Sequence, residues 1–218
     1  MALPVLIEGR SGSGKTYSLK NFKPGEIGII SVEKGRLPFK SELKTIRIPK
    51  YENSAEVNTF AQANAAKYAW IERMIQKADA PSIAIDDSQY LLANELFDRS
   101  GEKGYDKFTD MAKNFRNLIH FVNELENDDR IVYFLHHTEI DSDGREKCKT
   151  IGKMLDEKLC VEGCFDIVIF CQDHKFYTQA NGMSSAKSPE GMFDLEIPND
   201  LKDVDAKIRD YYGMSGGD

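Results

Sequence analysis

The sequence predicts an α/β fold in which a mostly parallel central sheet is flanked by helices. Apolar runs typical of buried strands alternate with segments that carry apolar residues at helical spacing, which is the pattern of strand–helix–strand units. Two short strands near the C-terminus, separated by a Gly- and Ser-containing turn, predict an antiparallel hairpin that extends the sheet. We expect a single domain over residues 1–213 and a flexible tail over 214–218.

The expected strands are short and rich in β-branched residues. Buried parallel strands of this kind read as continuous apolar runs, whereas the third run carries polar residues and is expected at the sheet edge. In chain order the runs cover residues 3–7, 27–33, 43–49, 82–86, 130–135 and 164–171, followed by the hairpin strands 176–180 and 192–197. We expect the strand that begins at residue 130 to stop at His136.

Helices are expected between these strands, where apolar residues recur at intervals of three and four. A helix should follow Thr16, and another should open at Ser54 and be stopped by Pro81. The remaining helices are expected over residues 89–97, 108–125, 150–159 and 204–212. The polar segments 98–105 and 140–149 are predicted to be exposed loops, the second of them charged and mobile.

Composition limits the kind of protein that this chain can be. The formal charge is 29 − 36 = −7, which argues against a surface coated in basic residues but allows a local cationic path to nucleic acid. The sequence shows no signal peptide and no apolar run long enough to cross a bilayer, so we expect a cytoplasmic protein. The four cysteines lack paired C-x-x-C spacing, which favours reduced thiols; His174 with Cys160 and Cys164 is the one zinc combination considered.

One motif indicates a specific binding function. Residues 9–16 read Gly, four residues, then Gly-Lys-Thr, between an apolar strand and a segment that can start a helix. The glycines allow successive backbone N–H groups to converge on an anion, Lys15 can reach the β- and γ-phosphates, and the Thr16 hydroxyl can bind Mg²⁺. This P-loop predicts that the protein binds a nucleoside triphosphate with Mg²⁺. The expected nucleotide-binding residues are Gly9, Arg10, Ser11, Gly12, Ser13, Gly14, Lys15, Thr16 and Tyr17.

A second carboxylate-bearing strand completes this expectation. Residues 82–85 are an apolar run that ends in Asp86 and Asp87. An aspartate at the carboxyl end of a strand beside the P-loop supplies the oxygen ligand that Mg²⁺ requires, and Asp86 is the first candidate because it follows the run directly. Hydrolysis also needs a residue that orients or deprotonates the attacking water, and Asp87 and Glu33 are both candidates for that role.

On the basis of these residues and their surroundings, the chain resembles the RecA-like recombination ATPases. More narrowly, it resembles the small single-domain AAA/RecA-type proteins that bacteriophages encode. The likeness rests on the strand-plus-glutamate Ile29–Glu33, on the strand Ile83–Ser88 with its Asp-Asp-Ser step, and on Tyr133–His137, where the family carries a γ-phosphate sensor. It covers most of the chain from Pro4 to about Ile197, with the P-loop as its sharp motif.

The resemblance implies a RecA-like P-loop ATPase with ATP and Mg²⁺ as cofactors. It implies that Glu33 is the catalytic base, and that His137 senses the γ-phosphate where the family commonly has glutamine. Lys187 would act as a finger toward the nucleotide of a neighbouring subunit. Together with Lys15 and Asp87, these are the expected catalytic residues.

The same resemblance implies a role in phage DNA recombination or single-strand annealing. Its expected partners are single-stranded DNA, contacted by the loops 99–107 and 145–153, and either further copies of the chain or another phage recombination protein. Two alternatives stay open: a small-molecule or nucleotide kinase, and a nucleotide-switched module that loads or binds a partner protein. A GTPase is disfavoured because the sequence has no Asn-Lys-x-Asp base-reading motif.

Overall fold

The computed structural model describes residues 1–33, 35–50, 57–127, 129–152, 156, 159–180, 182 and 184–215. Its centre is one sheet with the strand order β3-β2-β4-β5-β1-β7-β8-β9, and β6 pairs with β5 outside this path. The strands are β1 Leu3–Gly9, β2 Ile27–Ser31, β3 Thr45–Arg47, β4 Ser82–Asp86, β5 Ile131–Ile140, β6 Glu146–Cys148, β7 Ile167–Gln172, β8 Lys175–Tyr177 and β9 Glu196–Pro198. The pairings from β3 across to β7 are parallel, whereas β6, β8 and β9 join antiparallel.

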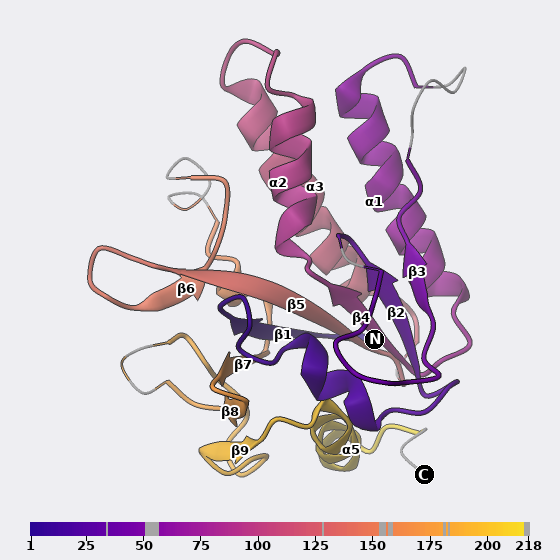
Figure 1. Cartoon of the computed structure of the whole chain (residues 1–218), viewed down its shortest axis with the longest axis vertical. Coiled ribbons are helices and arrows are strands. Elements are labelled where there is room, and N and C mark those ends of the chain that lie inside the picture. Colours follow the sequence, from indigo (N-terminus) through magenta and orange to yellow (C-terminus); the bar gives the residue numbers. More distant parts are fainter. Residues whose placement is uncertain are drawn as a thin grey trace.

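Helices cover both faces of this sheet (Figure 1). On one face lie α1 Phe60–Lys77, α2 Gln89–Asp98 and α3 Asp106–Glu124; on the other lie the 3₁₀ helix η1 Thr16–Asn21 and α5 Leu201–Tyr212. A second 3₁₀ turn, η2, covers Glu162–Cys164. Each face has its own apolar core, with Ile71 and Phe115 among the buried residues of the first and Leu19 and Ile208 among those of the second.

The alternation of side chains along each strand decides which core a residue joins. On β5, Phe134 belongs to the core under α1–α3, whereas Tyr133 and Leu135 belong to the core under η1 and α5. The same alternation continues past the apolar part of the strand, so that the consecutive residues His136 and His137 lie on opposite faces of the sheet.

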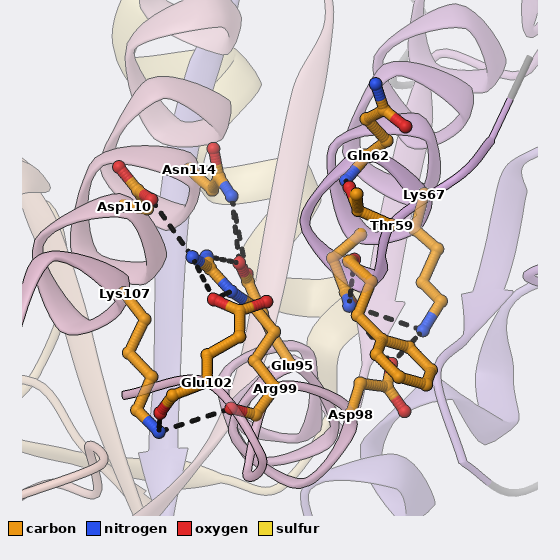
Figure 2. A network of polar contacts seen from close by, with 12 residues as sticks. Thr59, Gln62, Lys67, Glu95, Asp98, Arg99, Glu102, Lys107, Asp110 and Asn114 are labelled. Atoms are coloured by element: carbon orange, nitrogen blue, oxygen red, sulfur yellow. Dashed lines mark hydrogen bonds and ion pairs between the residues drawn. The ribbon is translucent and has the colours of Figure 1, made fainter. Parts of the chain in front are cut away.

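A polar network ties the helical layer together (Figure 2). Arg99 donates to the fully buried Glu95 at 3.0 Å and to Asp110 at 3.0 Å, and Asn114 of α3 donates to the same Glu95 at 3.1 Å. Burial raises the pKa of Glu95, and the hydrogen bonds from Arg99 and Asn114 oppose that rise. These contacts fix the end of α2 against α3.

The fold class predicted from the sequence is confirmed: a mostly parallel sheet lies between helices and ends in antiparallel strands. The predicted edge strand is β3, which pairs with β2 alone. The expected hairpin strands pair as β8 and β9, with Phe176 opposite Ile197. The helices expected over 89–97, 108–125 and 204–212 are α2, α3 and α5.

Two helix predictions need correction. The segment after the P-loop is a six-residue 3₁₀ helix that ends at Asn21, and Pro24 disfavours its continuation through Lys23. The next helix begins at Phe60, where the Thr59 side chain accepts a hydrogen bond from the Gln62 amide and caps the first turn. Its predicted start at residue 54 lies outside the described residues.

Two loop predictions also need correction. β5 runs on to Ile140, beyond the stop expected at His136, because the segment predicted to be mobile folds back as β6, with Thr138 opposite Cys148. At the other end of the chain, within the predicted tail, the Ser215 amide donates to Asp129 at 2.6 Å. The helix expected over 150–159 and the tail residues 216–218 lie largely or wholly outside the described residues.

Candidate nucleotide-binding site

The P-loop connects the carboxyl end of β1 to η1. Lys15 is buried, and its ammonium group donates hydrogen bonds to the Gly9 carbonyl at 2.6 Å and to the Arg10 carbonyl at 2.9 Å. The loop thus folds back on its own lysine, which places a positive charge beside two of its backbone carbonyls. This is the arrangement in which an anion can exchange for the carbonyl contacts.

Glycine is required in this loop by close packing as well as by backbone angle. Gly14 has φ +111°, and a Cβ at this position would lie 2.3 Å from Nδ2 of Asn199 and 2.7 Å from Nδ1 of His174. At Gly9 a Cβ would lie 2.3 Å from the Cys171 carbonyl oxygen. Larger residues would push the loop away from the β7–β8 turn and from the segment after β9.

Residues from the C-terminal half of the chain clamp the P-loop. The His174 amide donates to the Ser13 carbonyl at 3.0 Å, the Cys171 thiol donates to the same carbonyl at 3.3 Å, and Asn199 Nδ2 donates to the Gly14 carbonyl at 3.0 Å. Burial raises the pKa of Cys171 to about 11, so this residue stays a thiol at neutral pH. The sequence reasoning did not anticipate this clamp.

The turn that forms the clamp is strained. Asp173 and His174 have φ angles of 49° and 59°, which places two consecutive non-glycine residues in the left-handed region. Two-residue hairpin turns of this handedness usually contain Asn-Gly, and left-handed non-glycine residues cost about 1 kcal/mol or more each. The short polar stretch between two apolar runs was the available signal for this turn.

The metal-binding residues predicted from the sequence meet in the structure. The Thr16 hydroxyl donates to Asp86 Oδ1 at 2.8 Å, which joins the start of η1 to the end of β4. Hydroxyl and carboxylate oxygens are ligands that suit Mg²⁺, which takes few protein ligands and keeps waters and phosphates for the rest. Thr16 and Asp86 therefore fit a magnesium ion that also contacts bound phosphates.

Asp87 and His137 form a second pair in the same place. Nε2 of His137 lies 2.9 Å from Asp87 Oδ1, and the ring packs edge-on against Tyr90 of α2 at 5.8 Å. Asp87 has φ 64°, a left-handed angle that turns its side chain away from the direction that an extended strand would give. A strained backbone that aims a carboxylate at a histidine in a cavity is a feature of reactive sites.

His136 does not belong to this pair. Its side chain is fully buried: Nε2 lies 2.9 Å from the Lys149 carbonyl and Nδ1 lies 3.0 Å from the Ser88 hydroxyl. Because a carbonyl oxygen can only accept, Nε2 carries the proton and Nδ1 is the acceptor. Burial lowers the pKa of His136 to about 4, so the ring is neutral near pH 7.

A cavity of about 350 Å³ connects these groups. It is lined by Ser11, Gly12, Gly14, Lys15, Thr16, Tyr17, Arg36, Pro38, Asp86, Asp87, His137 and His174. Tyr17 meets His174 edge-on at 5.4 Å, which gives one part of the cavity an aromatic wall. Arg36, Pro38 and His174 were not predicted as nucleotide-site residues.

Glu33, Arg10 and Lys187 do not line this cavity. Glu33 accepts a hydrogen bond from Asn94 of α2 at 2.7 Å and lies outside the cavity, and the Arg10 side chain binds Glu146 of β6 at 2.5 Å. Lys187 pairs through its backbone with Val168 of β7. The catalytic roles of Glu33 and Lys187 stay predictions.

The two loops proposed for DNA contact are largely engaged within the chain. In the first, Arg99 is bound by carboxylates as described above, and Lys107 donates to the Glu102 carbonyl at 2.8 Å, whereas Tyr105 is 71% exposed. In the second, Lys147 pairs with Asp156 at 2.5 Å. DNA binding through either loop stays a prediction.

These features define a candidate nucleotide-binding site of the P-loop type on a mostly parallel sheet. No family model matches the sequence, and no curated protein matches it significantly. Among solved structures, one similar chain is described as an ATPase from the type III secretion system of pathogenic bacteria. The likeness has a TM-score of 0.42 and 13% identity, covers 77% of this chain and spans half the length of that one, which is too low to assign a function.

Within the described ranges, every helix is either too short or too polar to cross a bilayer.

Proposed function

We propose that this chain binds ATP with Mg²⁺ and hydrolyses it. The observation that carries the proposal is the contact between Thr16 and Asp86 at 2.8 Å, beside a P-loop that folds back on Lys15. Residues far apart in the sequence supply the phosphate-binding and metal-binding groups of one cavity. Phosphate-binding and metal-binding groups assembled in one cavity are typical of proteins that bind a polyphosphate.

Each group has a separate role in this proposal. Lys15 and the loop amides neutralise and orient the phosphates, and Thr16 and Asp86 hold the magnesium ion, which draws charge from the β- and γ-phosphates when it is bound. The aromatic wall of Tyr17 and His174 offers a surface for the nucleoside. Positioning and charge stabilisation are the main catalytic requirements of phosphoryl transfer.

The attacking water needs a partner in the same cavity. The geometry supports the pair Asp87 and His137, which is already inside it, over Glu33, which is bound to Asn94 outside it. An ionised Asp87 accepts a hydrogen bond from the protonated Nε2 of His137. Nδ1 of His137 then carries no proton and can accept a hydrogen bond from water. Glu33 would reach the attacking water only after its hydrogen bond with Asn94 is broken.

The test is phosphate release from ATP by the purified protein with Mg²⁺ and without any acceptor. Lys15→Ala should lower turnover by ~100-fold or more, because the charge that binds the phosphates is lost. Lys23→Ala is the matched control, since this exposed lysine lies outside the cavity, and it should leave turnover within about twofold. Equal turnover by Lys15→Ala and the wild-type protein would contradict the proposal.

The finer role implied by the family resemblance is ATP-dependent recombination or annealing of single-stranded DNA. It predicts that single-stranded DNA stimulates phosphate release and that binding weakens steeply with salt. A kinase would instead need an acceptor for turnover, and a loader would respond to a protein partner. The same assay with each addition separates the three.

A further inference from the structure

A second cluster of reactive side chains lies on the sheet face opposite the nucleotide cavity. Glu8 immediately precedes the P-loop, and its side chain is fully buried. Within the part of the chain that the structure describes, one group of three potential metal ligands comes together: Glu8, Cys148 and Glu162, whose ligand atoms all lie within 4.8 Å of one another. They come from β1, β6 and η2, so the fold itself assembles the cluster.

The three side chains are buried and held in place. Cys148 is 2% exposed and Glu162 is 8% exposed. Glu162 Oε1 accepts a hydrogen bond from the Cys148 amide at 2.6 Å, which orients its second oxygen. Metal ligands are commonly fixed by such contacts outside the coordination sphere.

The carboxyl group of Glu8 is only partly hydrogen-bonded within the described residues. Its Oε2 lies 3.5 Å from the Cys148 thiol, but no residue in the described ranges forms a hydrogen bond with its Oε1. Burial, reinforced by the charge of Glu162, raises the pKa of Glu8 to about 8, although hydrogen bonds from the Cys148 thiol and the Ser185 backbone oppose that rise; burial also raises the pKa of the Cys148 thiol. A buried carboxyl oxygen without a partner costs free energy unless a ligand compensates it.

We propose that Glu8, Cys148 and Glu162 form a binding site for a thiophilic divalent cation, with Zn²⁺ as the best fit. In tetrahedral zinc sites with Zn–S of about 2.3 Å and Zn–O of about 2.0 Å, sulfur and oxygen ligands lie about 3.5 Å apart. Glu8 Oε2 and Cys148 Sγ are separated by that distance. Uptake of the ion releases the protons of Glu8 and Cys148 to solvent.

One further thiol borders the cluster. Cys160 Sγ lies 3.6 Å from Glu162 Oε2, but it is not part of the group whose ligand atoms all lie within 4.8 Å of one another. A cavity of about 390 Å³ is lined by Cys148, Cys160 and Glu162 and gives the ion a route from solvent. Thiolate ligands select zinc over magnesium, so this site is chemically distinct from the one formed by Thr16 and Asp86.

The ion would join three elements beside the P-loop. β6 already contacts the loop through Glu146 and Arg10 at 2.5 Å, and Glu146 Oε2 is another buried oxygen without a hydrogen-bond partner in the described ranges. A cation that bridges β1, β6 and η2 would fix this arm against the first strand. We therefore expect zinc to stabilise the folded chain independently of nucleotide.

The experiment is a titration of the chelator-treated full chain with Co²⁺, a spectroscopic substitute for zinc. We expect one ion per chain, a thiolate-to-cobalt charge-transfer absorption, loss of that absorption when Zn²⁺ is added, and no loss with excess Mg²⁺. Cys148→Ser should remove the absorption. Cys171→Ser is the matched control, because this buried thiol lies on the other face of the sheet, and it should keep it.

A second variant covers the case in which Cys148→Ser does not fold. Glu162→Gln keeps the thiol and the acceptor for the Cys148 amide, and it should weaken cobalt binding by ~10-fold or more while the absorption returns at saturation. Zinc should raise the unfolding temperature of the wild-type protein and raise that of Glu162→Gln less. Absorption that survives in Cys148→Ser, affinity unchanged in Glu162→Gln, or the absence of cobalt binding to the wild-type chain would overturn the proposal.

Discussion

His136 and His137 are consecutive residues of β5, yet they lie in two regions with different chemistry. His136 is enclosed on the side of α1–α3, and both ring nitrogens face groups of the chain, Lys149 and Ser88. His137 is 12% exposed, lines the cavity and faces Asp87. His136 has both ring nitrogens in hydrogen-bonding contact with the chain, whereas His137 presents its ring to the cavity and so to a ligand there. Stability should therefore depend on the first and turnover on the second.

The largest expected effect is on the enclosed side. His136→Ala should lower the free energy of unfolding by about 4 kcal/mol, because it leaves a cavity, removes the ring contact of Ser88 and leaves the Lys149 carbonyl without its imidazole partner. Urea unfolding measures this change. A loss below about 1 kcal/mol would show that the network around His136 contributes little to the fold.

The pH dependence of stability should identify His136 specifically. Its pKa is about 4 in the folded chain and about 6.5 when unfolded, so the unfolded chain binds the proton first as the pH falls. Stability is retained above pH 6.5 and lost toward pH 4, by about 3 kcal/mol for this group. The stability difference between the wild-type protein and His136→Gln should shrink over that window, as measured by urea unfolding at each pH. A constant difference would contradict the lowered pKa.

On the cavity side the effect should fall on turnover. Asp87→Asn and His137→Ala should each lower phosphate release by ~100-fold, equivalent to about 2.7 kcal/mol of barrier, with stability changed by about 1 kcal/mol or less. Glu33→Gln is the comparison, because Glu33 lies outside the cavity on Asn94. Loss of turnover in Glu33→Gln with activity kept in Asp87→Asn would return the role of base to Glu33.

The sequence predicted those features that local patterns encode. Apolar runs located the parallel strands, and the spacing of glycines with Lys15 and Thr16 predicted a phosphate site that stays a proposal. The strand that ends in Asp86 was recognised because carboxyl ends of parallel strands meet at one edge. The pattern could not show which of His136 and His137 faces the cavity, since alternation fixes only that they differ.

The features that the sequence did not predict depend on contacts between residues far apart in the sequence. His174 and Asn199 reach the P-loop because β8 and β9 extend the sheet past β1, an arrangement that no local spacing records. The segment that forms β6 was predicted to be a mobile loop because it is rich in charged residues. In the structure, Glu146 and Cys148 of this segment are buried against β1 and the P-loop. Tertiary pairing outweighed local propensity there.

The clamp on the P-loop has a consequence for biosynthesis. The loop itself is complete by Thr16, but the side-chain amide that holds the Gly14 carbonyl belongs to Asn199, 185 residues after Gly14 in the sequence. A ribosome that adds about 5–20 residues per second therefore exposes the loop for roughly ten seconds or more before its support emerges. During translation the nascent chain cannot form the fully supported site, and shortened products that stop before β9 would lack it.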